Sequence, residues 1–106
     1  MFTIGITTFR RRYDMVEKLI SQIKSYKPDI EIILTVNADY HEKFDEEYRV
    51  KILNLCQMYN SIFPIIFPKF TGLSKMWNTI ILNASSEYIL VLNDDIELLE
   101  ESLPSL

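Results

Sequence analysis

The sequence contains one cysteine and two glycines among its 106 residues, and it has neither a basic excess nor a long apolar run. The single cysteine, Cys56, excludes an intramolecular disulfide and favours a reduced setting. The formal net charge of −4 argues against nucleic-acid binding through a basic surface. No apolar run approaches the roughly 20 residues of a membrane-spanning helix, and residues 1–6 lack the features of a signal peptide. We therefore expect a cytoplasmic protein, with a peripheral contact to the membrane left open.

The residues that are present are typical of a small globular domain. Hydrophobic residues make up 48% of the chain and charged residues 25%, a balance that disordered chains do not show. The length suffices for one hydrophobic core but not for two. We therefore expect a single domain over residues 1–106, with a sheet that is truncated at the C-terminal end.

Seven segments alternate between a strand pattern and a helix pattern. Apolar and β-branched runs predict strands at Phe2–Thr8, Ile30–Val36, Ser61–Phe67 and Tyr88–Leu92. Single apolar stripes at helical spacing predict helices at 13–26, Lys43–Tyr59 and Leu73–Ala84. Strands that alternate with helices pair in parallel through right-handed crossovers. The sequence therefore predicts an α/β fold, a three-layer Rossmann-like domain with a mainly parallel four-stranded sheet.

Individual residues suggest further detail. Pro64 cannot donate to a strand ladder, so the third strand should lie at an edge. The last run, Tyr88–Leu92, is continuously apolar and reads as a buried parallel strand. Trp77 shares the apolar stripe of the third helix and should lie in the core, as should Cys56 in the second. His41 follows a polar turn and reads as a solvated residue.

Polar residues follow three of the predicted strands, at Thr7–Arg10, Asn37–Asp39 and Asn93–Asp95. In a parallel sheet these loops open on the same edge, where α/β proteins bind their ligands. Asp94 and Asp95 are adjacent carboxylates whose desolvation is costly unless something pairs with them, and a divalent cation is the obvious partner. Asn37 and Asp39 read equally well as turn formers.

Four segments of the chain, in matching order and spacing, resemble the family 2 glycosyltransferases of the GT-A fold. They include an opening strand and loop, an acidic turn, a segment running from a glycine through a helix start, and a strand leading into an acidic triplet. These segments are Ile4–Arg11, Asn37–Asp39, Gly72–Asn78 and Glu87–Asp95. The neutral Asn93 stands where the triplet of this family usually has its first acid, and Trp77 stands where an arginine is common.

The resemblance implies a role for each matching residue. Asp95 would bind Mn²⁺ or Mg²⁺, because these ions prefer oxygen ligands. The diphosphate of the donor would complete the coordination shell of the metal. Asp94 would lie near the ribose or sugar hydroxyls, and Asp39 would accept a hydrogen bond from the nucleobase. The remaining residues would contact the base or the phosphates. The base pocket would contain Thr7, Thr8 and Phe9, and the phosphate contacts would come from Arg10 and Lys75.

The reaction implied by the resemblance is sugar transfer from a nucleotide diphosphate sugar donor to a hydroxyl of a carbohydrate or lipid-linked acceptor. The metal would stabilise the charge that develops on the leaving diphosphate. A general base would deprotonate the acceptor, and in this family it comes from an acid well after the triplet. We therefore expect that base beyond Leu106, so that this chain alone is either an inactive fragment of a longer enzyme or a naturally short relative that binds without catalysing.

Two other function classes stay open on the sequence. The first is a non-catalytic Rossmann-like binding or interaction module, in which the acidic residues at the strand ends would have no functional role. A metal-dependent nucleotidyltransferase also places acids at strand ends, although Thr7–Arg10 lacks the glycines of a phosphate loop. In every case, a sheet that ends after the fourth strand exposes apolar surface, so we expect self-association through that surface.

Overall fold

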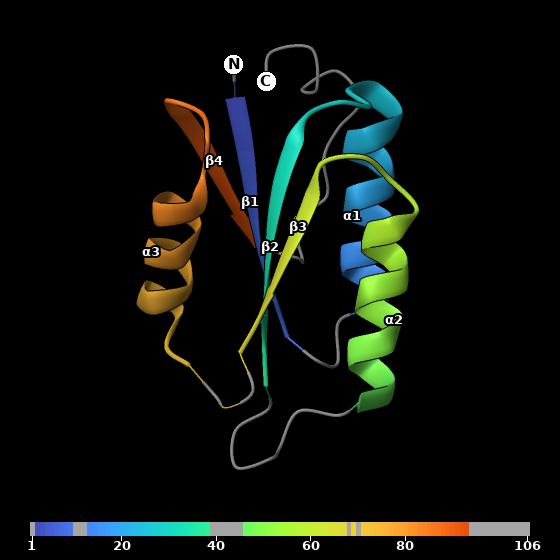
Figure 1. The fold of residues 1–106 in the computed structure, drawn as a ribbon, viewed down its shortest axis with the longest axis vertical. Helices are drawn as coiled ribbons and strands as arrows, with labels where there is room; N and C mark the ends of the chain where they lie inside the picture. Colours follow the sequence, from blue (N-terminus) through green and yellow to red (C-terminus); the bar gives the residue numbers. More distant parts are fainter. Residues whose placement is uncertain (1, 10–12, 39–45, 68, 70, 94–106) are drawn as a thin grey trace.

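The computed structural model describes residues 2–9, 13–38, 46–67, 69 and 71–93, and these form an α/β fold (Figure 1). All seven predicted elements are present, with ends within a few residues of the prediction. They are β1 (Phe2–Phe9), α1 (Tyr13–Tyr26), β2 (Glu31–Asn37), α2 (Glu46–Gln57), β3 (Ile62–Ile66), α3 (Leu73–Asn83) and β4 (Tyr88–Asn93). The predicted fold class is therefore confirmed.

The four strands form one all-parallel sheet in the order β3-β2-β1-β4. In the centre of the sheet, Gly5 of β1 is opposite Ile33 of β2 and Val91 of β4. The helices α1 and α2 cover one face and α3 covers the other, which gives three layers (Figure 1). Because all strands run the same way, their carboxyl ends all point toward the lower end of the molecule in this view.

The two outer strands test two of the predictions. β3 lies at one edge, as Pro64 predicted. β4 lies at the other edge, so the prediction of a buried strand at Tyr88–Leu92 is wrong. Leu92 is buried but Tyr88 is 65% exposed. The reason is that no described strand lies beyond β4, and α3 packs mainly over β1 and β2.

The main core lies between the sheet and the α1–α2 layer. Strand side chains of alternating position, such as Ile4, Ile6 and Leu34, pack there against the apolar stripes of the two helices. Cys56 of α2 belongs to this cluster, which confirms its predicted packing role. Burial raises the pKa of the Cys56 thiol to about 11, so it is protonated and unreactive at neutral pH.

The opposite face of the sheet is covered by α3, which comes very close to β1. Met76 and Ile80 form the buried stripe of this helix, and a Cβ atom at Gly5 would lie 2.4 Å from Cγ2 of Ile80. Trp77 is 40% exposed, so the prediction that it lies in the core is wrong. It sits one helical position round from Met76, on a flank of α3 that the narrow sheet does not cover.

A buried lysine stabilises the amino end of the sheet. Nζ of Lys24 donates to the backbone oxygens of Pro28 (3.1 Å), Ile30 (2.6 Å) and Asn60. These carbonyls belong to the turns before β2 and β3, so one ammonium group joins both turns to α1. Burial lowers the pKa of Lys24, and nearby Asp29 opposes that shift. Its role is structural, since it lies at the end of the sheet opposite to the carboxyl ends.

Glu31, the first residue of β2, fixes the chain that leaves α3. Its Oε1 accepts hydrogen bonds from Oγ1 of Thr3 (2.7 Å) and the amide of Ser85 (3.0 Å), and its Oε2 accepts one from Oγ of Ser85 (2.5 Å). Burial raises the pKa of this carboxyl, but the hydrogen bonds from Ser85 and Thr3 outweigh burial, so the pKa is lowered. The charged carboxylate therefore stabilises the fold.

We predict that Glu31→Gln lowers the free energy of unfolding by about 1 kcal/mol at pH 7, because hydrogen bonds to a charged acceptor are stronger than those to an amide. A lowered folded pKa contributes stability above the unfolded value, and this contribution is lost as the pH falls through the folded value. Denaturant titrations should therefore show the two proteins converging below the ordinary glutamate pKa of 4.5. A difference that stays constant with pH would contradict this assignment.

Candidate functional site

The carboxyl ends of three strands meet where the sequence places its polar loops. β1 is central, with β2 on one side and β4 on the other. Phe9 is opposite Asn37, so β1 and β2 end together, and Thr7 is opposite Asn93, so β4 ends two residues before β1 does. The strand ends from which the three polar loops begin therefore lie at the same edge of the sheet, as predicted.

A hydrogen bond links the ends of β1 and β4. Oγ1 of Thr7 donates to Oδ1 of Asn93 over 3.0 Å, and the Thr7 side chain is buried while Asn93 is exposed. Asn93 is the last residue of β4 and directly precedes Asp94 in the sequence. The bond therefore fixes the last described residue before the two adjacent acids of the sequence. It also gives the neutral first member of the triplet a defined structural role.

A second pairing fixes the segment that enters α3. The fully buried Asn37 at the end of β2 donates from Nδ2 to the carbonyl of Thr71 (2.6 Å), and its Oδ1 accepts from the amide of Thr71 (2.9 Å). The side chain thus pairs with backbone 34 residues away in the way a strand would. Sequence reasoning assigned Asn37 no partner, and nothing local in the sequence indicates one.

The N-terminus of α3 lies at this edge of the sheet (Figure 1). Its N-cap residue, Gly72, makes no side-chain hydrogen bond to the first turn, and that turn contains no acidic residue. The amides of Lys75 and Met76 both donate to the carbonyl of Gly72, and the Lys75 side chain is exposed. An uncapped helix start beside a lysine favours an anion, because amide groups and a cation act together there.

The structure places the predicted base-pocket residues as follows. Thr7 and Thr8 are both buried, and because strand side chains alternate they lie on opposite faces of the sheet. The side chain of Phe9 and the whole of Arg10 lie outside the described residues, as do Asp39, Asp94 and Asp95. The roles predicted for these residues therefore stay predictions, and only Thr7, Thr8 and Lys75 are placed.

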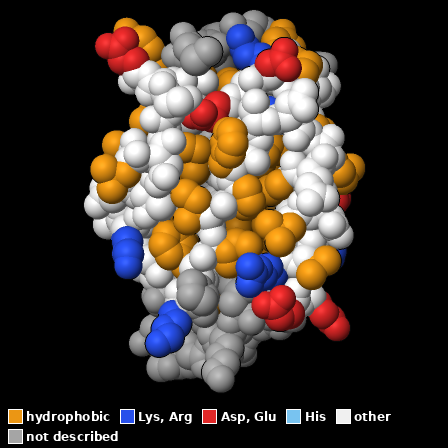
Figure 2. Space-filling view, viewed as in Figure 1, with side chains coloured by type: hydrophobic (Ala, Val, Ile, Leu, Met, Phe, Trp, Pro, Cys, Tyr) orange, Lys and Arg blue, Asp and Glu red, His pale blue; other side chains and the backbone are white. Residues whose placement is uncertain are grey.

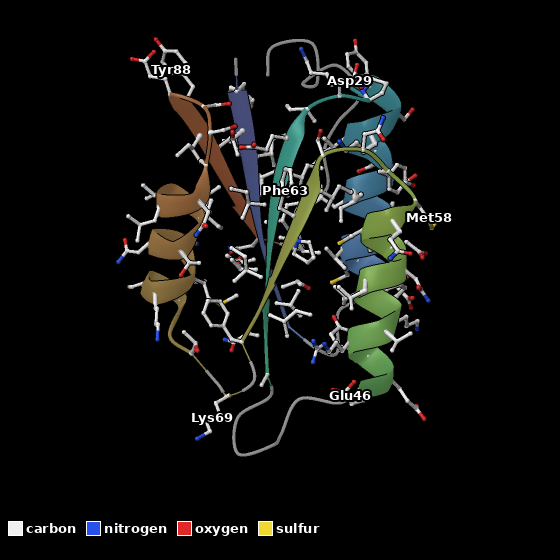
Figure 3. All side chains as sticks on the ribbon, viewed as in Figure 1. Asp29, Glu46, Met58, Phe63, Lys69 and Tyr88 are labelled. Atoms are coloured by element: carbon white, nitrogen blue, oxygen red, sulfur yellow. The ribbon has the colours of Figure 1, made fainter. Side chains whose placement is uncertain are left out.

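Within the described residues, no cluster of metal ligands lies at this site, and the cavity described below lies elsewhere. The described part of the chain holds no group of three acidic, histidine or cysteine side chains that could bind a metal. A cavity of about 460 Å³ lies at the amino end of the sheet, where Pro28, Ile30, Glu31 and Ser85 line it. It is far from the strand ends that converge, and Asp29 and Tyr88 mark the same end in Figure 3. It is therefore not the predicted donor pocket.

Comparison with known proteins gives one match. A family model described as Glycosyl transferase family 2 matches residues 3–106. No curated protein and no solved structure matches the chain significantly. Among the described helices, none has the length and apolar character needed to cross a membrane. The matched range contains the three described helices and, apart from Phe2, the four described strands. The chain therefore belongs to glycosyl transferase family 2, with a general role in glycosyl transfer.

Proposed function

We propose that this chain is the donor-binding domain of a glycosyltransferase and binds a nucleotide diphosphate sugar together with a divalent metal. The observation that carries the proposal is the meeting of the ends of β1, β2 and β4 with the N-terminus of α3 at one edge of the sheet. Parallel α/β sheets bind their ligands at this edge. The acceptor would be a hydroxyl of a carbohydrate or of a lipid-linked compound.

The acidic turn after β4 would hold the metal. Carboxylate oxygens fit Mn²⁺ or Mg²⁺, and Asp95 is the ligand that we propose. When bound, the metal would supply Lewis-acid stabilisation of the departing diphosphate. Asp94 would contact the ribose or sugar hydroxyls. The bond from Thr7 to Asn93 supports this arrangement, since it holds the residue that precedes both acids.

The base and the phosphates would lie on either side of this turn. Asp39 would accept a hydrogen bond from the nucleobase, and the segment Thr7–Phe9 would border the base. Lys75 and the first amides of α3 would bind the phosphates, because both carry positive potential. Arg10 is a further candidate for a phosphate contact. The pairing of Asn37 with Thr71 supports this assignment, since it fixes the start of α3 beside the strand ends.

Removing the charge of Lys75 tests the phosphate contact. We predict that Lys75→Ala weakens binding of UDP or GDP in the presence of Mn²⁺ about tenfold, which corresponds to one charge-assisted hydrogen bond. Isothermal titration calorimetry would measure the dissociation constants.

Lys27→Ala is the matched control for this test. It removes the same charge from the amino end of the sheet and should change the constant less than about twofold. Equal effects of the two substitutions would contradict a phosphate site at α3. A wild-type chain that binds neither nucleotide would overturn the proposed function.

We also propose that the chain self-associates. Large apolar side chains are exposed on α3 and β4, among them Trp77, Ile81 and Tyr88. Patches of this kind usually mark an interface. Sedimentation velocity at increasing concentration would reveal the association, and a monomer at every concentration up to about 1 mM, where even weak dimers form, would contradict it.

A further inference from the structure

The last two residues of β2 hold both ends of the connection between β3 and α3. The carbonyl of Val36 accepts a hydrogen bond from the amide of Phe67 (2.9 Å), which is the first residue after β3. The carboxamide of Asn37 then pairs with the amide and the carbonyl of Thr71, two residues before α3 begins. The backbone that leads into α3 is therefore attached to the end of β2 on both sides of this connection.

The side chain of Asn37 acts like an extra peptide unit at the end of β2. It presents an N–H donor and a carbonyl acceptor side by side, and Thr71 takes both, over 2.6 and 2.9 Å. No part of Asn37 is exposed to solvent. A carboxamide that is buried and paired in this way does not reach a bound ligand. Any effect of Asn37 on binding therefore acts through the segment that it holds.

Only Gly72 separates Thr71 from α3. The carbonyl of Gly72 accepts a hydrogen bond from the amide of Lys75 (3.1 Å). The amides of Leu73 and Ser74 come before this bond, and amides at such a position in a helix are donors for an anion. The position of Thr71 therefore determines where these donors lie relative to the strand ends.

The segment that Asn37 holds is basic, although the chain as a whole is acidic. Residues 48–86 contain no acidic side chain, while the chain has a net charge of −4. The exposed Lys69 and Lys75 lie on either side of Thr71 in the sequence. Basic side chains (blue) are visible at the lower left of Figure 2, beside the start of α3, and Figure 3 labels Lys69 there. This segment therefore has the charge that attracts a diphosphate.

We propose that Asn37 is a positioning residue for the diphosphate of the donor, and that it holds the start of α3 so that Lys75 and the first amides of the helix bind the phosphates. This inference rests on the proposed function and adds to it a residue that does not touch the ligand. A turn former would act only on its neighbours in the sequence, and a base contact would need an exposed carboxamide. Because Asn37 acts on the phosphate end, its loss should weaken every ligand that carries a diphosphate, with or without a base.

Pyrophosphate with Mn²⁺ tests this assignment, because it carries two phosphates and no base. Asn37→Ala removes both bonds to Thr71 and should weaken binding of Mn²⁺–pyrophosphate at least about tenfold, since groups that only orient a ligand residue typically contribute ten- to hundredfold. It should weaken the nucleotide that the wild type binds, UDP or GDP, by the same factor. Isothermal titration calorimetry of the whole chain would measure both constants. A loss confined to the nucleotide would indicate a base contact and overturn the proposal, as would no loss for either ligand.

Glu31→Gln is the matched control for stability. Glu31 holds the other end of α3 through Ser85, so this variant also weakens the attachment of the helix to β2. It should leave both dissociation constants within about twofold, because it lies far from the strand ends at the site. Equal losses in Asn37→Ala and Glu31→Gln would mean that binding follows the stability of the fold, and would overturn the positioning role.

Hydrogen exchange of the Thr71 amide tests the pairing in the wild-type chain, whether or not Asn37→Ala folds. This amide should exchange at least about tenfold more slowly than in an unstructured peptide, with and without Mn²⁺–pyrophosphate, because exchange requires the bond to open. An unprotected Thr71 amide would overturn the proposal. A wild-type chain that binds neither pyrophosphate nor nucleotide would overturn the proposed function and this inference with it. Wild-type binding that Asn37→Ala leaves unchanged would overturn this inference alone.

Discussion

Replacing Gly5 with alanine is expected to lower the free energy of unfolding by about 2–3 kcal/mol, a cost typical of overpacking a core. The new Cβ would lie 2.4 Å from Cγ2, 2.9 Å from Cδ1 and 3.3 Å from Cβ of Ile80. Ile80 is fully buried and β-branched, so its χ1 rotamer cannot easily change. Since the contact includes its Cβ, α3 itself would have to move away from β1. Urea denaturation followed by circular dichroism would measure the loss.

Two further variants show whether this contact causes the loss. Gly72 has φ −66°, and a Cβ atom added to it would meet no other atom within 4 Å, so Gly72→Ala should cost well under half as much. In an Ile80→Ala background, Gly5→Ala should cost much less, because the two closest atoms, Cγ2 and Cδ1, are gone and only Cβ at 3.3 Å remains. Additive losses in the double variant would contradict the proposed close approach of α3 to β1.

Replacing Asp95 with alanine is expected to weaken metal-dependent nucleotide binding at least about a hundredfold, because even residues that only support metal ligands contribute ten- to hundredfold. Asp95 follows the end of β4 by two residues, and that end is bonded to β1 through Asn93 and Thr7. The fold should be unaffected, since the main core cluster is formed by residues of the strands and of α1 and α2.

Asp29→Ala serves as the matched control for this substitution. Asp29 is an exposed acid at the amino end of the sheet, where Figure 3 labels it. Removing it changes the net charge equally but should leave the dissociation constant within about twofold. Calorimetry of both variants with UDP and GDP would separate the outcomes. Similar constants for Asp95→Ala and wild type would contradict the assignment of the metal ligand.

The helices and strands could be predicted from the sequence because the residue patterns that indicate them are local. The apolar stripe of α1 and the β-branched run of β1 each lie within a few turns or residues of chain. Pro64 also acts locally, since its missing amide restricts β3 to an edge wherever the rest of the sheet lies. Parallel pairing then follows from the alternation of strands and helices.

The wrong predictions concern burial, which depends on the neighbouring elements and not on the residues of the segment itself. An apolar run is the same whether neighbours bury it or not, so Tyr88–Leu92 gave no sign that β4 is an edge. The stripe of α3 likewise did not show that Trp77 lies on the uncovered flank. The pairings of Asn37 with Thr71 and of Glu31 with Ser85 join residues 34 and 54 positions apart. No periodicity within one segment can indicate such partners.

The meeting of the strand ends at one edge was predictable from the sequence, but the hydrogen bonds that hold this edge were not. Strand order brings the ends of β1, β2 and β4, after which the polar residues follow in the sequence, to one edge, and the lysine near the start of α3 was identified from its place in the sequence. The structure adds the hydrogen bonds that hold the strand ends and α3 in place. β2 fixes both ends of α3, through Glu31 at one end and Asn37 at the other. Thr7 fixes the last residue of β4.

The central claim is that the carboxyl edge of this sheet binds a nucleotide through a metal. Calorimetric titration of the whole chain with UDP and GDP, once with Mn²⁺ and once with EDTA in its place, tests this claim most directly. We predict saturable binding of one of the two nucleotides with Mn²⁺ and at least about a hundredfold weaker binding with EDTA. Binding that is equally strong with EDTA, or no binding of either nucleotide, would contradict the claim.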